Sequence, residues 1–296
     1  MPNQFSRRLA IKNIVAGTAA LSTSGMLSAN AFASGQQKQL TLKGNINHSV
    51  CQWIYDDMTL DQLCKAVKGI GMTAIDLLAP KDWPVLQKNG IYCSMCYTVD
   101  NLGLYKGWNN KEYHPHLIKD YTDSIALVAK AGYKNLICFS GARNGMDDWT
   151  GLDNCVEGLK KILPLAEKSG VIIVMELLNS KIDHKDYMCD KTVWGVELCK
   201  RIGSPNLKLL YDIYHMQIDE GDVIRTIQNY HEYIGHYHTG GVPGRNEIDD
   251  TQELYYPAIM RAIVATGYKG HVAQEFIPKN PDKIAALKKC VEICDV

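Results

Sequence analysis

The stretch from Leu207 to Gln217 reads LKLLYDIYHMQ, an apolar run that ends in Asp212 and is followed three residues later by His215. A short apolar run bounded by polar residues is typical of a buried β-strand. An ionised carboxylate at the end of such a strand is costly in free energy unless a positive group compensates it. The stretch therefore predicts a strand that delivers Asp212 to a metal ion or to an arginine.

The whole chain alternates short apolar runs with longer amphipathic ones, which is the pattern of a parallel α/β sheet. The expected strands are 40–50, 74–78, 91–97, 135–139, 171–178, 207–211, 233–238 and 271–276. The expected helices are 60–70, 83–88, 116–131, 151–169, 192–202, 222–229, 252–265 and 281–293. Eight such units predict a single (β/α)8 TIM barrel. A doubly wound sheet is the alternative, but no G-x-G-x-x-G follows the first strand.

The first 33 residues contain three basic residues and no acidic one, in the order expected of an export signal. Arg7 and Arg8 precede an apolar run, and Ala31-Phe32-Ala33 offers a small-residue cleavage site. This order is typical of a twin-arginine signal peptide. An ordinary N-terminal helix or membrane anchor is the alternative, but the apolar run is short and rich in small residues. We therefore expect a signal at 1–33, a linker at 34–39 and a periplasmic catalytic domain at 40–296.

Charge and cysteine content limit the classes of partner. Without the leader the chain has 29 basic and 32 acidic residues, a net charge of −3, which gives no basic surface for nucleic acid or for an anionic membrane. The sequence contains ten cysteines, which in an exported protein raises the question of disulfides. Cys93, Cys96, Cys138 and Cys199 lie inside apolar runs, so we expect them to fill the core as free thiols.

Four consecutive predicted strands each end in one potential metal ligand: Glu176, Asp212, His238 and Glu275. Active sites of TIM barrels lie at the carboxyl ends of the strands, so these side chains are expected to converge. Carboxylates and imidazole suit a divalent ion such as Mn²⁺, Mg²⁺ or Co²⁺, with Zn²⁺ as a further candidate. Each acid taken alone fits an ordinary ion pair equally well. His236 lies two residues before His238 on the same strand face and is expected to be a hydrogen-bonded core histidine.

The motifs MELLN, YDIYHMQ, GHYHT and VPGR resemble those of the xylose-isomerase-like TIM barrels, within the hydroxypyruvate isomerase and ketose 3-epimerase branch. The resemblance covers residues 44–278. It implies that the four strand-end residues hold one divalent metal ion and that His215 and Arg245 contact substrate oxygens. It also implies proton transfer through an enediolate, with the metal as Lewis acid and with Glu176 and Glu275 as the two bases.

Several aromatic residues and one further histidine are candidates for substrate contact. His48 and Trp53 follow the first strand, where the barrel rim places them near a substrate, although Trp53 fits a core position equally well. Trp108 and Trp149 lie in long loops and are candidates for a lid or a subunit contact.

The leading prediction is a metal-dependent isomerase, similar to hydroxypyruvate isomerase, for a small hydroxy-aldehyde, hydroxy-ketone or sugar. A ketose 3-epimerase, a sugar dehydratase or lyase on the same scaffold, and an exported sugar-binding protein without turnover are the alternatives. Two opposed glutamates argue against binding alone, because binding needs ligands but not two bases. A DNA-repair endonuclease is disfavoured, because it requires more metal ligands and a basic face. Substrate identity and oligomeric state stay open, and a homo-oligomer is compatible with the sequence.

Overall fold

The computed structural model describes residues 40–296, and the predicted signal peptide and linker lie outside them. Eight parallel strands form one sheet in the order β1-β8-β7-β6-β5-β4-β3-β2. An isolated parallel bridge between Cys51 and Asp76 joins β1 to β2 and closes the sheet into a barrel. The strands are β1 (Asn47–Val50), β2 (Ala74–Leu78), β3 (Tyr92–Cys96), β4 (Asn135–Cys138), β5 (Ile172–Glu176), β6 (Leu207–Asp212), β7 (Ile234–Thr239) and β8 (His271–Gln274).

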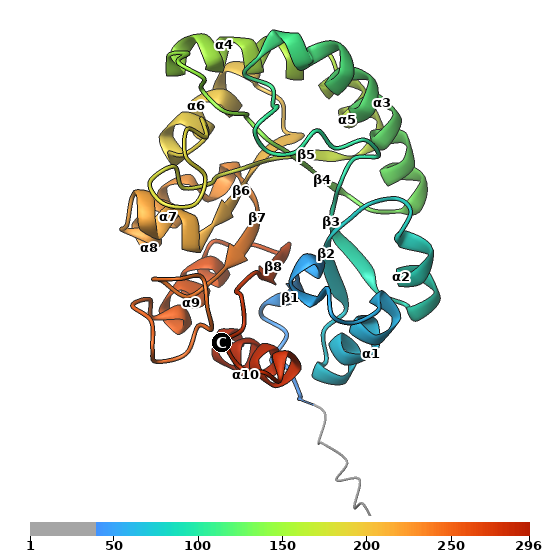
Figure 1. The fold of residues 1–296 in the computed structure, drawn as a ribbon, viewed down its shortest axis with the longest axis vertical. Helices are drawn as coiled ribbons and strands as arrows, with labels where there is room; N and C mark the ends of the chain where they lie inside the picture. Colours follow the sequence, from blue (N-terminus) through green and yellow to red (C-terminus); the bar gives the residue numbers. More distant parts are fainter. Residues whose placement is uncertain (1–39) are drawn as a thin grey trace, which may run out of the picture. The chain divides into compact units, whose positions relative to one another are not determined.

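Helices surround the ring of strands (Figure 1). In chain order they are α1 (Leu60–Ile70), α2 (Trp83–Asn89), α3 (His114–Ala131), α4 (Asp148–Leu159), α5 (Leu163–Ser169), α6 (Thr192–Ile202), α7 (Ile213–Asp219), α8 (Val223–Tyr230), α9 (Tyr256–Ala265) and α10 (Lys283–Cys294). Three short 3-10 helices accompany them: η1 (Gln52–Tyr55), η2 (Lys111–Tyr113) and η3 (His231–Tyr233). This architecture confirms the prediction of a single (β/α)8 TIM barrel.

Local sequence signals explain where individual helices begin and end. The Thr59 side chain accepts from the Gln62 amide while the Gln62 side chain accepts from the Thr59 amide, and this capping box starts α1. Gly71 ends the same helix with φ of 98°, a left-handed conformation that favours glycine. The first strand begins at Asn47 rather than at residue 40, because the bends at 44–46 interrupt the extended chain before it.

Two helical predictions were wrong in detail. The single helix expected at 151–169 is two helices, because Pro164 lies in the first turn of α5 and has no amide hydrogen with which to continue α4. The short helix α7 was not predicted. It begins directly after β6, where the Asp212 side chain caps it by accepting from the His215 amide at 3.1 Å.

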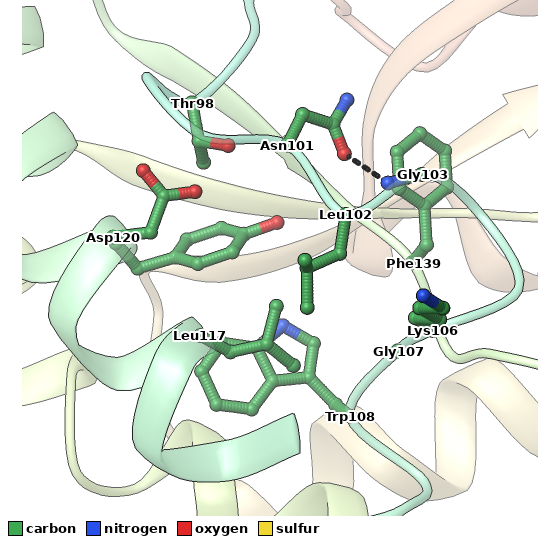
Figure 2. Close-up of a pocket in the computed structure, with 11 residues that line it drawn as sticks. Thr98, Asn101, Leu102, Gly103, Lys106, Gly107, Trp108, Leu117, Asp120 and Phe139 are labelled. Carbon is green, nitrogen blue, oxygen red and sulfur yellow. Dashed lines mark hydrogen bonds between the residues drawn. The ribbon is translucent and has the colours of Figure 1, made fainter.

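All ten cysteines are buried free thiols, which confirms that they fill the core. Trp108 is also fully buried, so its side chain has no surface for contact with another subunit, and a lid role stays a prediction. Its ring packs edge-on against Tyr121, with 5.2 Å between centroids, beside Leu102 and Leu117 (Figure 2). The cavity that these residues line measures about 10 Å³, which is at the lower limit for one water molecule. The loop therefore contributes packing and offers no space for a ligand there. Trp149 is exposed, and its predicted role stays open.

None of the helices in residues 40–296 combines the length and the apolar character that crossing a bilayer requires.

Candidate active site

The four predicted metal ligands meet at the carboxyl-terminal mouth of the barrel. Glu176 ends β5, Asp212 ends β6, His238 is the penultimate residue of β7 and Glu275 directly follows β8. The strand register brings them into line, because Asp212 pairs with His238 and His238 pairs with Ala273. One donor atom from each of the four lies within 4.8 Å of the others, and all four side chains are buried. The structure therefore brings together the residues that the strand-end pattern selected.

Contacts inside this group centre on Glu275. Its Oε2 lies 2.8 Å from His238 Nδ1 and accepts from Arg245 Nη2 at 2.7 Å, while its Oε1 accepts from the Trp53 indole at 2.8 Å. Glu176 Oε1 is 3.4 Å from His238 Nδ1. The Glu275 carboxylate is thus fixed in orientation by three neighbours, whereas Glu176 is held by fewer contacts.

Burial and charge act differently on the three carboxylates. Burial raises the pKa of Asp212 to about 7, against the opposing effect of Arg245. Burial also raises the pKa of Glu176 above its ordinary value. At Glu275 burial acts in the same direction, but the charges of Arg245 and His238 hold the pKa well below its usual range. The Arg245 guanidinium therefore compensates Glu275 well and leaves Asp212 and Glu176 short of positive charge.

The donor set fits a divalent metal ion. Asp212 Oδ2 is buried and has no hydrogen-bond partner among the described residues, and an unpaired buried carboxylate oxygen is costly. Three carboxylates and one imidazole nitrogen form a ligand set of hard and borderline donors suited to Mn²⁺, Mg²⁺, Co²⁺ or Zn²⁺. A cation between these atoms supplies the missing charge, so the residues present fit the expected metal.

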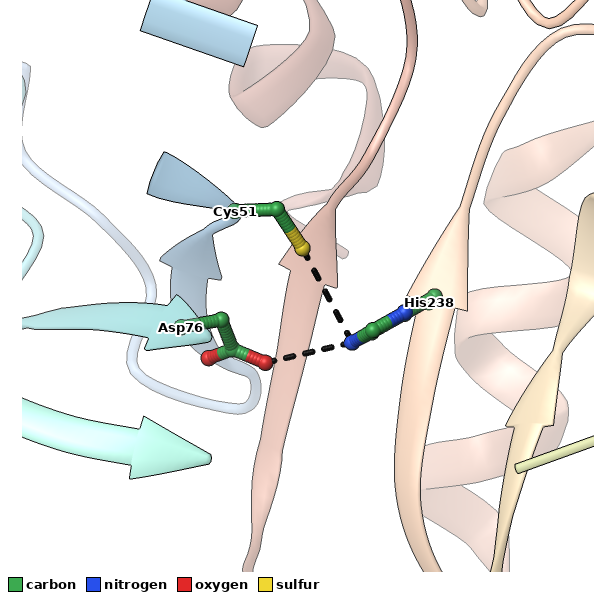
Figure 3. A group of neighbouring side chains, drawn as sticks. All are labelled: Cys51, Asp76 and His238. Atoms are coloured by element: carbon green, nitrogen blue, oxygen red, sulfur yellow. Dashed lines mark hydrogen bonds and ion pairs between the residues drawn. The ribbon is translucent and has the colours of Figure 1, made fainter. Parts of the chain in front are cut away.

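The other ring nitrogen of His238 faces a second group of buried side chains (Figure 3). His238 Nε2 lies 3.2 Å from Asp76 Oδ2 and 3.8 Å from Cys51 Sγ. Asp76 Oδ2 is also 2.5 Å from His236 Nε2, which confirms the prediction of a hydrogen-bonded core histidine. With Nε2 directed to Asp76, Nδ1 of His238 is left to face the carboxylates as a ligand.

Cys51, Asp76 and His238 have metal-ligand chemistry, but Asp76 does not require a cation. Its Oδ1 accepts from Ser49 Oγ at 2.7 Å and from Ser94 Oγ, so both carboxylate oxygens have donors. Although burial opposes it, the charges and hydrogen bonds of His236 and His238 hold the pKa of Asp76 well below its usual range. The group is therefore a hydrogen-bonded support for His238 and does not need a second metal ion.

His215 is completely buried on α7, next to Asp212. Its Nδ1 is 2.6 Å from the Asn179 amide nitrogen, so the amide donates and the ring proton is placed on Nε2. That Nε2 lies 3.7 Å from Asp212 Oδ2 and has no hydrogen-bond partner. Burial holds the pKa of His215 well below its ordinary value, which keeps the ring neutral. A neutral ring with a free N–H is suited to donate to an oxygen atom.

A pocket of about 230 Å³ opens beside the four ligands. Two of its lining residues, Trp53 and Arg245, were predicted substrate contacts, and the Arg245 guanidinium lies 5.4 Å from the Trp53 ring centroid. The remaining lining residues are Leu77, Tyr97, Leu104, Phe139, Glu176, Leu178, His184 and Glu275. Tyr97 and Phe139 end the expected strands 91–97 and 135–139 but carry neither a carboxylate nor an imidazole, and His184 lies in a loop, so none of the three was predicted.

The substrate contact expected at His48 is corrected by the structure. Ser49 points into the barrel, where it contacts Asp76, and side chains alternate along a strand, so His48 points outward. Its Nε2 lies 3.6 Å from Asp295 Oδ1 near the end of the chain, and the side chain is buried. His48 therefore links the barrel wall to the C-terminal residues and does not line the pocket.

Comparison with proteins of known sequence gives relatives among isomerases. The chain is 35% identical over 124 residues to the 2-oxo-tetronate isomerase of Cupriavidus necator, covering 42% of this chain and 47% of the relative. It is 25% identical over 219 residues to the hydroxypyruvate isomerase of Escherichia coli, covering 71% of this chain and 84% of the relative. The chain spans about half the length of the first curated relatives that it matches.

Solved structures share the fold at lower identity. The AP endonuclease, family 2, from Brucella melitensis has a TM-score of 0.76 and 19% identity, covering 83% of this chain and 99% of that chain. The D-psicose 3-epimerase from Clostridium cellulolyticum, crystallised with D-tagatose, has a TM-score of 0.67 and 19% identity, covering 85% and 100%. A family model described as xylose isomerase-like TIM barrel matches residues 84–291. With its eight-stranded barrel and this match over more than half of its length, the chain belongs to the xylose isomerase-like TIM barrel family.

Proposed function

We propose that this protein is a divalent-metal-dependent isomerase that moves a proton between adjacent carbons of a small hydroxy-carbonyl compound. The observation that carries the proposal is the pair of buried glutamates, Glu176 and Glu275, which line one pocket beside a complete set of metal ligands. The isomerase relatives support the same reaction class.

The residues of the site suit a two-base mechanism. A divalent ion held by Glu176, Asp212, His238 and Glu275 supplies Lewis acidity toward the carbonyl of the substrate. One glutamate removes the proton from the carbon next to the carbonyl, which leaves an enediolate. The other returns a proton to the neighbouring carbon while the hydroxyl proton passes to the former carbonyl oxygen, so the reaction is redox-neutral and consumes no co-reactant. The guanidinium of Arg245 lines the pocket and offers donors for the oxygens that gain charge. His215 does not line the pocket, and its free N–H faces Asp212 Oδ2 at 3.7 Å.

The aromatic lining of the pocket is suited to limit competing proton donors near the reacting carbons. Three aromatic residues form part of the pocket wall: Trp53, Tyr97 and Phe139. Such a wall limits water access while the enediolate exists. An epimerase would use the same two glutamates, with the proton returned to the opposite face of the same carbon, and product identity separates the two outcomes.

Hydrogen exchange in D₂O tests the proposal. Metal-loaded protein is incubated with hydroxy-carbonyl compounds, and C–H exchange and rearranged product are followed by NMR. Glu176→Gln and Glu275→Gln are expected to lower the exchange rate by about 10²- to 10⁴-fold, with metal content measured in each because both residues are also proposed ligands. Glu157→Gln changes an exposed glutamate paired with Lys111 and serves as the control. Exchange that survives both substitutions at the site would exclude the two-base mechanism.

Export remains a proposal of its own. We infer that residues 1–33 direct the protein to the periplasm through the twin-arginine route, on the strength of Arg7 and Arg8 before the apolar run. Replacing both arginines by lysine is expected to retain the protein in the cytoplasm, as measured by cell fractionation. Unchanged periplasmic yield would contradict this route.

A further inference from the structure

A second cavity, the outer pocket, adjoins the pocket beside the metal ligands and measures about 540 Å³. His184 and Arg245 line both cavities, so the two spaces meet at these side chains. The inner pocket, at about 230 Å³, is smaller than the roughly 300 to 1,000 Å³ typical of ligand sites, whereas the outer pocket lies within that range. A ligand that reaches the carboxylates therefore has further space beyond His184 into which it can extend.

Much of the outer pocket is lined by residues without a polar side-chain group. They come from the segments that follow β5, β6, β7 and β8 at the mouth of the barrel: Ile182, Ile218, Pro243, Gly244 and Ile277. The Ile182 and Ile277 side chains are 64% and 45% exposed. A single exposed isoleucine is ordinary, but several around one cavity are typical of an interaction site. The lining therefore favours an apolar occupant.

The polar side chains of the outer pocket offer little to a polar occupant. Asp183 Oδ2 accepts from the Tyr214 hydroxyl at 2.8 Å and from the Asn179 amide at 2.6 Å, so Tyr214 presents its ring rather than a free donor. Burial lowers the pKa of His184 below its ordinary value, which keeps the ring at the junction neutral. A sugar unit or a peptide in this space would need a hydrogen-bond partner for each buried hydroxyl or amide, and unpaired groups are costly in free energy. An apolar group has no such requirement.

We propose that the outer pocket binds an apolar substituent of the substrate. The reacting hydroxy-carbonyl end then lies in the inner pocket, and a hydrocarbon chain or ring lies against Ile182, Ile218 and Ile277. Burial of this substituent removes apolar surface of both partners from water, which favours binding without a charged contact. The inference rests on the proposed isomerase function and narrows its substrates to amphipathic compounds. These differ from the small polar compounds that name the relatives, which are 2-oxo-tetronate, hydroxypyruvate and D-psicose.

A homologous series of 1-hydroxy-2-ketones isolates the effect of the apolar substituent. Hydroxyacetone, 1-hydroxy-2-butanone, 1-hydroxy-2-hexanone and 1-hydroxy-2-octanone share one hydroxymethyl ketone and differ only in the length of the alkyl chain. Isothermal titration calorimetry of the metal-loaded protein gives their affinities without reference to turnover. Each methylene that enters the outer pocket is expected to raise the affinity by about threefold to fourfold. The octanone should therefore bind at least about tenfold more tightly than the butanone.

Substitutions in the outer pocket test where the alkyl chain binds. Ile182→Asn and Ile277→Asn each replace an exposed apolar side chain by a polar one, from different sides of the barrel mouth. Each is expected to lower the ratio of octanone affinity to butanone affinity by about fivefold, whereas Ile182→Val keeps the wall apolar and should change the ratio by less than about twofold. Val193→Asn, at an exposed valine of α6 that lines neither pocket, is the control and should leave the ratio unchanged. Melting temperatures show whether each variant is folded.

The outcomes separate this inference from the proposed function. An affinity that does not rise with chain length, or a rise that both asparagine variants retain, overturns the inference, while C–H exchange of the short ketones in D₂O still supports the isomerase. Tight binding of the octanone without C–H exchange in any ketone counts against the isomerase and leaves the apolar subsite in place. Absence of binding throughout the series overturns the subsite as well. If a second copy of this chain covers the outer pocket instead, sedimentation shows a dimer that Ile182→Asn dissociates, and this result also overturns the inference.

Discussion

Replacing Asp76 by asparagine tests whether the proposed metal site depends on a residue outside its set of four ligands. Asp76 is fully buried on β2 and accepts from four neighbours. One of its oxygens meets His236 Nε2 at 2.5 Å and His238 Nε2 at 3.2 Å, and the other meets the hydroxyls of Ser49 and Ser94. Asparagine keeps the shape of the side chain but removes the charge and turns one acceptor into a donor.

Either orientation of the new amide weakens His238 as a ligand. If the NH₂ group faces the histidines, the proton of His238 moves from Nε2 to Nδ1, the atom that lies 2.8 Å from Glu275. If the carbonyl oxygen faces them, the tautomer is kept but the imidazole loses the polarising negative charge. Loss of such a support costs about 10- to 100-fold in metal affinity, or about 1.4 to 2.7 kcal/mol.

Competition with a chromophoric chelator measures the affinity of Asp76→Asn for Mn²⁺, Co²⁺ and Zn²⁺ without reference to activity. Cys51→Ala is the matched control, because Cys51 approaches the same ring nitrogen at 3.8 Å, beyond the range of a strong hydrogen bond, and is expected to change affinity by less than about threefold. The melting temperature of the metal-free variant shows whether the barrel is intact. Wild-type affinity in an intact Asp76→Asn, or an equal loss in Cys51→Ala, would refute the reasoning.

Three further outcomes are expected. Asp212→Ala removes the carboxylate oxygen that lacks a hydrogen-bond partner, so elemental analysis after dialysis should show less than one metal ion per chain. Asp222→Ala, at an exposed aspartate, is the control and should retain the metal. Full metal content in Asp212→Ala would exclude Asp212 as a ligand. Chelation of the metal should lower the melting temperature, because an ion present at 100 times its Kd stabilises the fold by about 2.7 kcal/mol, and a melting temperature that is independent of metal concentration would contradict the site. Gly107→Ala places a Cβ 2.3 Å from the backbone nitrogen of Gly141. It should therefore destabilise the barrel by about 3 kcal/mol and lower the melting temperature by about 6–12 °C. Gly69→Ala on α1, whose new Cβ has no atom within 4 Å, is the control and should not lower the melting temperature.

The sequence predicts the barrel well where periodicity and end signals agree. The expected segments 60–70, 74–78 and 192–202 coincide with α1, β2 and α6. The two helices are amphipathic runs that end at a glycine, and β2 is a short, fully buried and mostly apolar run. The prediction failed where a proline divides a long amphipathic stretch, as at Pro164, and where a side chain of a strand caps a helix at once, as Asp212 does for α7. Such effects depend on contacts that periodicity does not record.

The site was predictable only in part, for similar reasons. Ligands at strand ends share a common edge, so Glu176, Asp212, His238 and Glu275 could be grouped from topology alone. Asp76 carries the same signal as Asp212, a carboxylate inside an apolar strand, and could have been found by applying that rule to every strand. His184 could not have been found, since its place in the pocket depends on the path of the loop after β5. His48 was misplaced because the strand face was not determined.

The pairing of β1 with β8 joins the first strand of the barrel to its last, so this part of the sheet can form only after every strand has been synthesised. Residues 47–50 cannot pair with residues 271–274 until these have been synthesised. The Lys43 amide then donates to the Asp295 side chain, and the Lys43 ammonium donates to the Asp295 carbonyl, each at 2.9 Å. Glu275 follows β8, so it is the last of the four proposed ligands to leave the ribosome. A nascent chain therefore holds three of these side chains and an open sheet edge until β8 and Glu275 have been synthesised. We expect metal capture to follow the synthesis of Glu275, and loss of the Lys43–Asp295 contacts to weaken the junction between β1 and β8 beside the site.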